Sequence, residues 1–310
     1  MMDTLTVSPA MPQVLTSCGL PLDTAPDRLG VLRTSDDIAD DLPALRDRMH
    51  QDGYLYLPGY LDRDLVLDAR RDIFTQLAAE SYLRPATAVM DAFAGPERKN
   101  GLRPDVAKAS APLQTLLYAG RMMAFYRGFL EGEPLHFDYT WLRAVAPGNG
   151  TPPHGDSVFM NRGTRNLYTG WTPLGDVGYE QGGLIVLEGS HKLDRIRNNY
   201  GNKDVDAYCS NRPDGPEYAS GEKWWGGWLS KNPTHLRERL GGRWLTHEFR
   251  AGDLLTFTMN TVHGSLDNHS DRIRLSCDFR YQLASEEVDE RWVGENPVGH
   301  GPGGKRARIC

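Results

Sequence analysis

The sequence is poor in cysteine and has no long apolar run. Its four cysteines, Cys18, Cys209, Cys277 and Cys310, are widely scattered, and none forms a Cys-x-x-Cys pair. This spacing suggests neither a disulfide framework nor a zinc knuckle. No run of about 18 apolar residues occurs, so no transmembrane helix is expected. The first 20 residues lack the basic and apolar segments of a secretory signal, which predicts a cytoplasmic protein.

Positive charge is also scarce. Lysine and arginine total 35 against 41 acidic residues, and the formal net charge is -6. This balance argues against a general binder of nucleic acid or of anionic membranes. There is no internal repeat and no low-complexity segment. The 310 residues, 39% hydrophobic and 25% charged, are typical of a soluble globular protein with one large core or two small ones.

Apolar residues recur at helical spacing in the first part of the chain. This pattern predicts helices over 36–50, from Asp62 or Asp64 to about Ala79, and over 113–131. The second helix would bury one face, formed by Leu65, Ala69, Ile73 and Leu77. A short strand is expected at Tyr54–Leu57. Residues 1–35 are interpreted as an arm over the core, and residues 84–112 as a long loop of the kind that forms a lid or binding loop.

The period then changes to that of strands. Short β-branched or aromatic segments, bounded by turn residues, lie at 139–146, 166–174, 183–187, 243–249, 253–259 and 273–282. Helices followed by strands predict a mainly β fold, a β-sandwich or jelly roll with flanking helices, in one domain over 1–310. Residues 193–242, which include Trp224, Trp225 and Trp228, would be an insertion that covers the barrel mouth. Residues 286–310 would be a C-terminal tail with a flexible end.

One short motif carries candidate chemistry. His154 and Asp156 are two residues apart, so on an extended strand both side chains point to the same face. With a second histidine they would form the facial triad of non-haem Fe(II) oxygenases. His263 is the best second histidine, because it follows an apolar strand and precedes Gly264-Ser265, where backbone can approach a ligand. The pair alone is weak, since a surface histidine beside a turn aspartate looks the same.

Arg274 lies 11 residues after His263, near the start of the next strand. A hairpin could bring it back beside the metal, where its planar fork suits a carboxylate. A surface salt bridge is the alternative interpretation of this arginine.

The order of several motifs resembles the phytanoyl-CoA dioxygenase family of Fe(II)- and 2-oxoglutarate-dependent oxygenases. The resemblance runs from about Gln51 to Gln282 and rests on D-G-Y-L-Y-L-P-G-Y-L, P-P-H-G-D, W-T-P-L-G-D, G-G-L-I-V-L-E-G-S-H-K, A-G-D-L-L-T-F and H-G-S-L-D-N-H-S-D-R-I-R. It implies a double-stranded β-helix, the cupin-like jelly roll, with Fe(II) held by His154, Asp156 and His263. It also implies that Arg274 binds the distal carboxylate of 2-oxoglutarate. Ser265 and Trp171, and more weakly Trp141, match positions that line the co-substrate site.

A rival pair, His136 and Asp138, has the same spacing. The family places its Gly-Gly-Leu strand roughly two to three dozen residues after the metal pair. Gly182 follows His154 by 28 residues and His136 by 46, which favours His154. His191 is interpreted as a structural residue rather than a ligand.

These observations predict an enzyme that oxidises a C–H bond of a small-molecule metabolite. Hydroxylation is the default outcome, with 2-oxoglutarate and O2 consumed and succinate and CO2 released; desaturation, ring closure and epimerisation stay open. Two alternatives remain: a cupin-like metal-dependent isomerase, which would not need Arg274, and a non-catalytic binding protein, which would be expected to lack a ligand. Neither nucleic acid nor membrane is an expected partner, and the chain would be a monomer or homodimer.

The substrate mouth is predicted from aromatic side chains. Trp225 and Trp228, together with the 84–112 loop, would close over the substrate, because exposed tryptophans in such number indicate a binding surface. The alternative is that these rings only cap the barrel core or form a subunit contact. In that case the pocket would lie among Phe159, Asn161 and Tyr168.

Overall fold

Two β-sheets form the centre of the molecule. The structure, a computed structural model, describes residues 14–97 and 101–310. The large sheet has the strand order β4 (Tyr54–Leu57), β12 (Leu254–Thr258), β8 (Tyr168–Pro173), β14 (Arg274–Leu283), β7 (Trp141–Val145) and β5 (Gly101–Leu102), with β6 (Pro134–His136) also paired to β14. The small sheet has the order β13 (His263–Ser265), β9 (Leu184–Leu187), β11 (Trp244–Thr246) and β3 (Leu29–Val31).

An apolar core lies between the sheets and confirms the predicted jelly roll. It gathers aromatic residues of the large sheet, such as Tyr56, Trp171 and Phe257, with aliphatic residues of the small one, such as Val186 and Leu245. All neighbouring strands in the two sheets pair antiparallel except β11 with β3, which is parallel. The register on β14 places Asp278 opposite Trp171 of β8 and Trp141 of β7.

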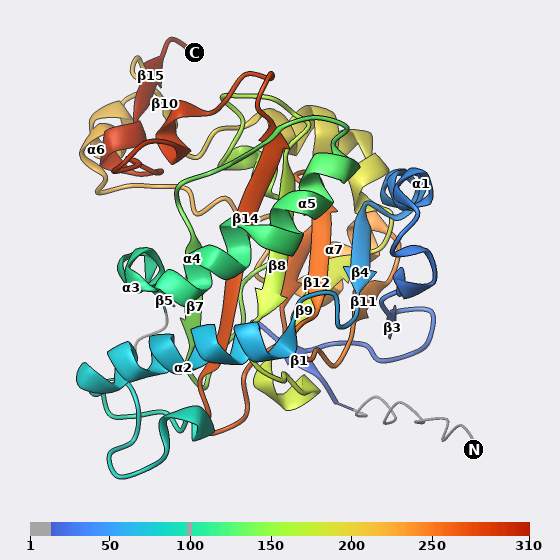
Figure 1. Cartoon of the computed structure of the whole chain (residues 1–310). Coiled ribbons are helices and arrows are strands. Elements are labelled where there is room, and N and C mark those ends of the chain that lie inside the picture. The colour runs from blue at the N-terminus through green and yellow to red at the C-terminus, as the bar shows by residue number, and fades with distance from the viewer. Residues whose placement is uncertain (1–13, 98–100) are drawn as a thin grey trace.

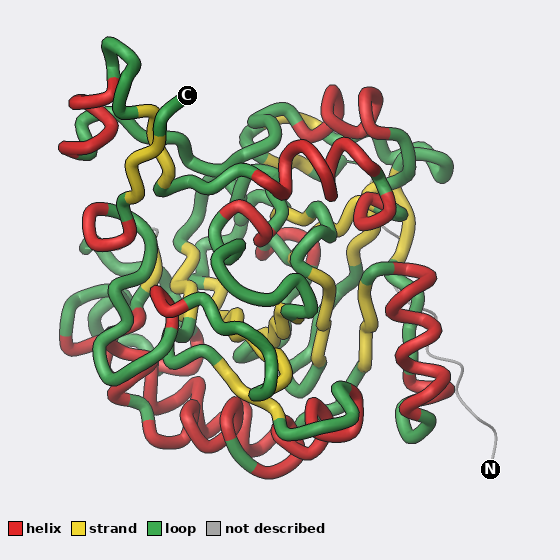
Figure 2. The backbone as a smooth tube through the Cα atoms, turned by 90° about the horizontal axis from the view of Figure 1, so that it is seen from above, coloured by secondary structure: helices red, strands yellow, loops and turns green. Residues whose placement is uncertain are grey.

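Helices cover the outer face of the large sheet (Figure 1). They are α1 (Leu42–Asp52), α2 (Arg63–Ala79), α3 (Pro104–Ala109), α4 (Ala111–Tyr118) and α5 (Gly120–Phe129). Figure 2, turned by 90°, shows a run of helices along one side of the strands and further helices on other sides of the molecule. The alternation on β14 explains this layer, because Leu275, Cys277, Phe279 and Tyr281 share the core cluster formed with these helices. Within the described ranges, no helix has the length and apolar character needed to cross a membrane.

The helix predictions hold in outline and fail in detail. Asp62 caps α2, since its side chain accepts hydrogen bonds from the backbone N–H groups of Asp64 and Leu65. Leu65 itself was placed on the wrong face, because it is 52% exposed and Val66 is buried in its place. The single helix predicted over 113–131 is two helices, α4 and α5, because the backbone is extended at Ala119 and left-handed at Gly120.

The predicted loop at 84–112 is wrong over its second half. It contains β5, α3 and the beginning of α4, and its residues 98–100 lie outside the described residues. Pro104 begins α3 and Pro112 lies in the first turn of α4, positions where proline favours a helix start. The described part of the N-terminal arm contains a small hairpin, β1 (Thr16–Ser17) with β2 (Leu20–Pro21), and then β3 of the small sheet.

The segment at 193–242 and the C-terminal tail are joined. The segment contains η6 (Arg195–Asn199), η7 (Tyr200–Asn202), β10 (Ala207–Cys209), α6 (Gly215–Ser220) and α7 (Pro233–Leu240). The tail is not the flexible end that was predicted. It forms η8 (Glu290–Trp292), η9 (Pro302–Gly304) and β15 (Arg306–Arg308), and β15 pairs in parallel with β10.

A disulfide between Cys209 and Cys310 joins the segment to the tail. The cysteine spacing did not suggest a disulfide, so this part of the sequence prediction is wrong. The two cysteines are 101 residues apart, so their spacing carries no local signature. Cys18 and Cys277 are free thiols.

Candidate functional site

Three predicted ligands meet between the two sheets. The backbones of His154 and His263 pair with each other, each N–H donating to the other's carbonyl at 2.9 Å. Gly155 is extended and Asp156 begins a short 3-10 turn, so the carboxylate turns toward both rings. Asp156 Oδ1 lies 4.0 Å from His154 Nε2 and 3.9 Å from His263 Nε2. All three side chains are buried, and their nearest donor atoms lie within 4.8 Å of one another.

The histidines are held in the form that binds a metal. His154 Nδ1 lies 2.8 Å from the carbonyl of Pro152, and His263 Nδ1 lies 3.0 Å from that of Thr261. Because a carbonyl only accepts, each Nδ1 carries the proton and each Nε2 keeps a free lone pair. Burial lowers the pKa of His263 and lowers that of His154 to about 3, so both rings are neutral at neutral pH.

Asp156 is oriented through its other oxygen. Its Oδ2 accepts hydrogen bonds from Thr169 Oγ1 at 2.5 Å and from an Arg280 guanidinium nitrogen at 3.0 Å. Burial alone would raise the pKa of Asp156, but the positive charge of Arg280 counts against this, and the pKa is lowered. Two neutral imidazoles and one carboxylate with a free oxygen fit the donor set of an Fe(II) facial triad.

A small cavity on one side of these ligands contains the predicted co-substrate arginine. Its walls are formed by Arg143, Thr151, His154, Leu184, Phe257, His263, Gly264, Arg274 and Asp278. Arg274 is 2% exposed and donates to the carbonyl of Gly182 at 2.7 Å. Its Nε has no hydrogen-bond partner, and no described carboxylate lies within 4.0 Å of the guanidinium.

Burial lowers the pKa of Arg274 to about 10, so it remains charged at neutral pH. A buried cation without an anion fits the carboxylate of a bound 2-oxo acid. The surface salt bridge, the alternative interpretation of Arg274, is not what the structure shows.

The other predicted co-substrate residues lie at different depths. Ser265 is buried next to this cavity, and its Oγ accepts a hydrogen bond from the N–H of Thr151, a wall residue. Trp171 lies in the core between the sheets, with its ring 4.8 Å from that of Phe249. Trp141 lies on a different cavity, described next.

A second cavity, of about 200 Å³, adjoins the ligands and is lined mainly by aromatic rings. Its walls are Leu102, Trp141, Arg143, Thr151, His154, Asp156, Phe159, Met160, Trp224, Gly226, Trp228, Arg280, Trp292 and His300. His154 belongs to both cavities, so the candidate metal position lies where they meet. We call this second space the aromatic cavity.

The structure divides the predicted substrate residues. Phe159 and Trp228 line the aromatic cavity, and Leu102 from the predicted loop joins them. Asn161 does not, because its side chain donates to the carbonyl of Lys203. Tyr168 lines a separate cleft beside α1 and α5. Trp225 packs edge-on against the ring of Tyr200, with centroids 6.0 Å apart.

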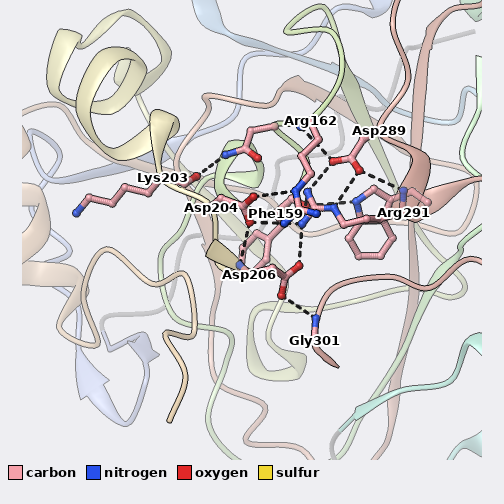
Figure 3. Close-up of polar contacts among 10 residues, drawn as sticks. Phe159, Arg162, Lys203, Asp204, Asp206, Asp289, Arg291 and Gly301 are labelled. Carbon is pink, nitrogen blue, oxygen red and sulfur yellow. Dashed lines mark hydrogen bonds and ion pairs between the residues drawn. The ribbon is translucent and has the colours of Figure 1, made fainter. Parts of the chain in front are cut away.

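The C-terminal tail completes the aromatic cavity, which sequence reasoning missed. The ring of Trp292 lies 4.8 Å from that of Trp141, and the ring of His300 lies 5.6 Å from that of Phe159. Arg291 fastens this wall: its guanidinium contacts Asp289, Asp206 and Asp204 and donates to the carbonyl of Phe159 at 2.8 Å, as Figure 3 shows.

The rival histidines have structural contacts. The ring of His136 stacks on that of Tyr118 at 4.1 Å, and its Nδ1 lies 3.0 Å from the carbonyl of Phe137. His191 lies with its Nε2 3.1 Å from the carbonyl of His50. Among the residues that the structure describes, His154, Asp156 and His263 form the one cluster of three or more metal-ligating side chains.

Comparisons with known proteins agree with this geometry. The model of the phytanoyl-CoA dioxygenase (PhyH) family matches residues 49–276. A 1-deoxypentalenic acid 11-beta-hydroxylase of Streptomyces exfoliatus is 29% identical over an alignment of 177 residues, and the match covers 51% of this chain. The matched region spans 60% of the length of that relative.

Solved structures share the fold. The epimerase SnoN, in complex with Fe3+, alpha ketoglutarate and nogalamycin RO, is 21% identical, with a TM-score of 0.54 over 84% of this chain and 94% of its own. EctD from S. alaskensis, with 2-oxoglutarate and 5-hydroxyectoine, is 17% identical, with a TM-score of 0.55 over 98% of this chain and 99% of its own. The carbocyclase SnoK is 19% identical, with a TM-score of 0.57 over 81% and 88%.

The family match covers well over half of the chain, and the double-stranded β-helix is present with a cluster of three side chains that could hold a metal ion. The chain belongs to the phytanoyl-CoA dioxygenase family of Fe(II)- and 2-oxoglutarate-dependent oxygenases.

Proposed function

We propose that this chain is a 2-oxoglutarate-dependent dioxygenase that hydroxylates a C–H bond of a small-molecule metabolite, releasing succinate and CO2. The observation that carries the proposal is the position of the three ligands between two cavities. One cavity holds the unpaired cation of Arg274, and the other is lined by aromatic rings. The first suits an anionic co-substrate and the second an organic substrate.

In this proposal His154, Asp156 and His263 would hold Fe(II), and Arg274 would bind the distal carboxylate of 2-oxoglutarate. Iron, 2-oxoglutarate and O2 together supply the oxidising power that breaks the C–H bond. The carbonyls of Pro152 and Thr261 keep the imidazoles in the ligand tautomer.

Thr169 and Arg280 hold the carboxylate of Asp156. The aromatic walls exclude water from the reacting carbon.

Hydroxylation is chosen over other outcomes because the curated relative is named a hydroxylase. The similar structures named an epimerase and a carbocyclase carry less weight, since they are 21% identical or less. A cupin-like isomerase would have no use for the buried, unpaired guanidinium of Arg274. The cytoplasmic location, the oligomeric state and the lack of a nucleic-acid partner stay predictions.

Succinate formation tests the proposal. The purified chain is loaded with Fe(II) and 2-oxoglutarate without oxygen, mixed with a panel of metabolites, and then exposed to O2. We expect at least one metabolite to raise the rate of succinate formation and to gain one oxygen atom. The same assay on His263→Ala should give no succinate above background. Equal succinate formation by this variant and the unaltered chain would refute the proposal.

A further inference from the structure

Arg280 has two buried N–H positions without an acceptor. It lies on β14, is 2% exposed and lines the aromatic cavity. One terminal nitrogen donates to Asp156 Oδ2 at 3.0 Å, and the guanidinium carbon lies 4.2 Å from the centre of the Trp141 ring. Its Nε and its other terminal nitrogen, Nη1, have no hydrogen-bond partner among the described residues. Buried donors are almost always paired, so these two require an acceptor.

The residues that the structure describes do not supply that acceptor. Asp278, two residues earlier on the same strand face, is bound by Arg143, with contacts of 2.6 and 2.7 Å. Asp156 already uses Oδ2 for Arg280, and its Oδ1 faces the two histidine ligands. The co-substrate is an unsuitable partner as well, since Arg274 lines the small cavity and Arg280 does not.

The surroundings of Arg280 indicate the chemistry of the missing partner. The apolar part of the wall of the aromatic cavity consists of Trp141, Phe159, Trp224, Trp228 and Trp292, with Leu102 and Met160. Such a wall accepts an apolar ring system, preferably planar enough to lie against aromatic faces. Of the two arginines in the wall, Arg143 is neutralised by Asp278, which leaves Arg280 with free N–H groups.

We infer that Arg280 anchors the substrate, and that the substrate is an apolar ring compound with an oxygen acceptor near the carbon that is oxidised. A free guanidinium N–H group, at Nε or Nη1, donates to a carbonyl, hydroxyl or carboxylate oxygen of the substrate. The remaining terminal nitrogen, Nη2, donates to Asp156, so this contact places the neighbouring C–H bond beside the metal ligands. The inference deepens the proposed function and rests on it for the reaction, while the binding site stands on its own contacts.

Three small probes of the same ring frame test the anchor: indane, which has no oxygen, 1-indanone, which has a carbonyl, and indane-1-carboxylate. Their dissociation constants are measured by anaerobic calorimetry on the chain loaded with Fe(II) and 2-oxoglutarate. We expect an oxygen-bearing probe to bind about ten- to a hundredfold tighter than indane, the range of a hydrogen bond to a charged group. Tighter binding of the ketone than of the carboxylate indicates that the substrate oxygen is uncharged. Tighter binding of the carboxylate indicates that it is anionic.

Arg280→Met should abolish the difference in affinity between indane and the oxygen-bearing probes, because it weakens the binding of the oxygen-bearing probes only. Arg280→Lys, which keeps a positive charge for Asp156 but lacks the N–H groups at Nε and Nη1, should lose most of this difference while retaining iron. Trp228→Phe is the matched control in the same wall and should weaken all three probes by a similar factor. Equal binding of indane and both oxygen-bearing probes to the unaltered chain would overturn the inference. So would a preference that survives in Arg280→Met, or a failure of all three probes to bind.

Iron content and substrate-free succinate formation, measured on the same samples, separate this inference from the proposed function. A chain that forms no succinate but still prefers the oxygen-bearing probe through Arg280 would refute the reaction and support the site. A chain that forms succinate but shows no such preference would support the reaction and overturn the anchor.

Discussion

Replacing Arg291 with methionine should loosen the tail from the rest of the molecule. The Arg291 side chain is 4% exposed, and its guanidinium lies 2.6 Å from Asp289, 2.7 Å from Asp206 and 3.5 Å from Asp204. Once it is removed, three carboxylates with little exposure share one remaining arginine, Arg162, which contacts Asp204 at 2.8 Å. The carbonyl of Phe159 also loses a donor, although it keeps a longer contact to Trp292.

The size of the effect follows from burial. Removing one partner of a buried ion pair lowers the free energy of unfolding by about 3–5 kcal/mol, because the charge left behind is not solvated. Unfolding entropy is roughly 2.1 cal/mol/K per residue, or about 0.65 kcal/mol/K for a chain of this length. The expected fall in Tm is therefore about 5–8 °C. Local detachment of the tail would hold the loss near the lower value.

Calorimetry and substrate kinetics check this prediction together. The aromatic cavity includes Phe159 and Trp292, so Arg291→Met should raise KM for substrate along with the drop in Tm. Arg306→Met is the control, because Arg306 lies on the same tail but is exposed and has no ion pair with a described residue. Its Tm should change by less than about 1 °C, as for most surface substitutions. If Arg291→Met also stays within that margin, the reasoning about the buried cluster is refuted.

Three further predictions concern the two cavities and the ligands. In the metal-free chain, lowering the pH from 8 to 5 should reduce the free energy of unfolding by about 2 kcal/mol through His154 alone. The reason is that His154 of the unfolded chain takes up a proton near pH 6.5, whereas native His154, with a pKa of about 3, does not. His154→Gln should remove this part of the pH dependence in denaturant unfolding, and an unchanged slope would contradict the assignment. Arg274→Lys should weaken the binding of 2-oxoglutarate about ten- to a hundredfold, because a charge remains but the bidentate fork is lost. Equal affinity of this variant and the unaltered chain in a titration would exclude this role of Arg274. Trp228→Ala should raise KM at constant Tm, whereas Trp225→Ala should lower Tm through its packing on Tyr200; the opposite pattern would exchange their roles.

The strands and the cluster of His154, Asp156 and His263 could be predicted from sequence because both depend on local patterns. Alternation and bounding turn residues located β4, β7, β8, β9, β12 and β14 to within a few residues. Arg274, Asp278 and Arg280 are all even-numbered on β14, so they share the inner face while Leu275 and Phe279 face the helices. Because every second residue of a strand lies on the same face, the position of Arg274 alone predicts that Arg280 also faces the space between the sheets.

The remaining features depend on contacts between distant parts of the chain. The Cys209–Cys310 disulfide and the β10–β15 pairing join segments about 100 residues apart, and no local motif marks them. Tyr168 lies on β8 directly before Thr169, yet the two side chains point to opposite faces, so only Thr169 reaches Asp156. The motif KWWGGW predicts tryptophans near the cavity mouth. It does not show that Trp228 lines the cavity and Trp225 does not, because the backbone conformation between the two residues decides which ring faces the cavity.

Anaerobic titration with Fe(II) followed by 2-oxoglutarate tests the central claim most directly. Chelation of Fe(II) by a 2-oxo acid produces a visible charge-transfer absorption, so one spectrum reports both the metal and the co-substrate. The account predicts one iron per chain and this absorption in the unaltered chain and in His136→Ala, and neither in His263→Ala. Iron binding and the absorption persisting in His263→Ala, or disappearing in His136→Ala, would contradict it.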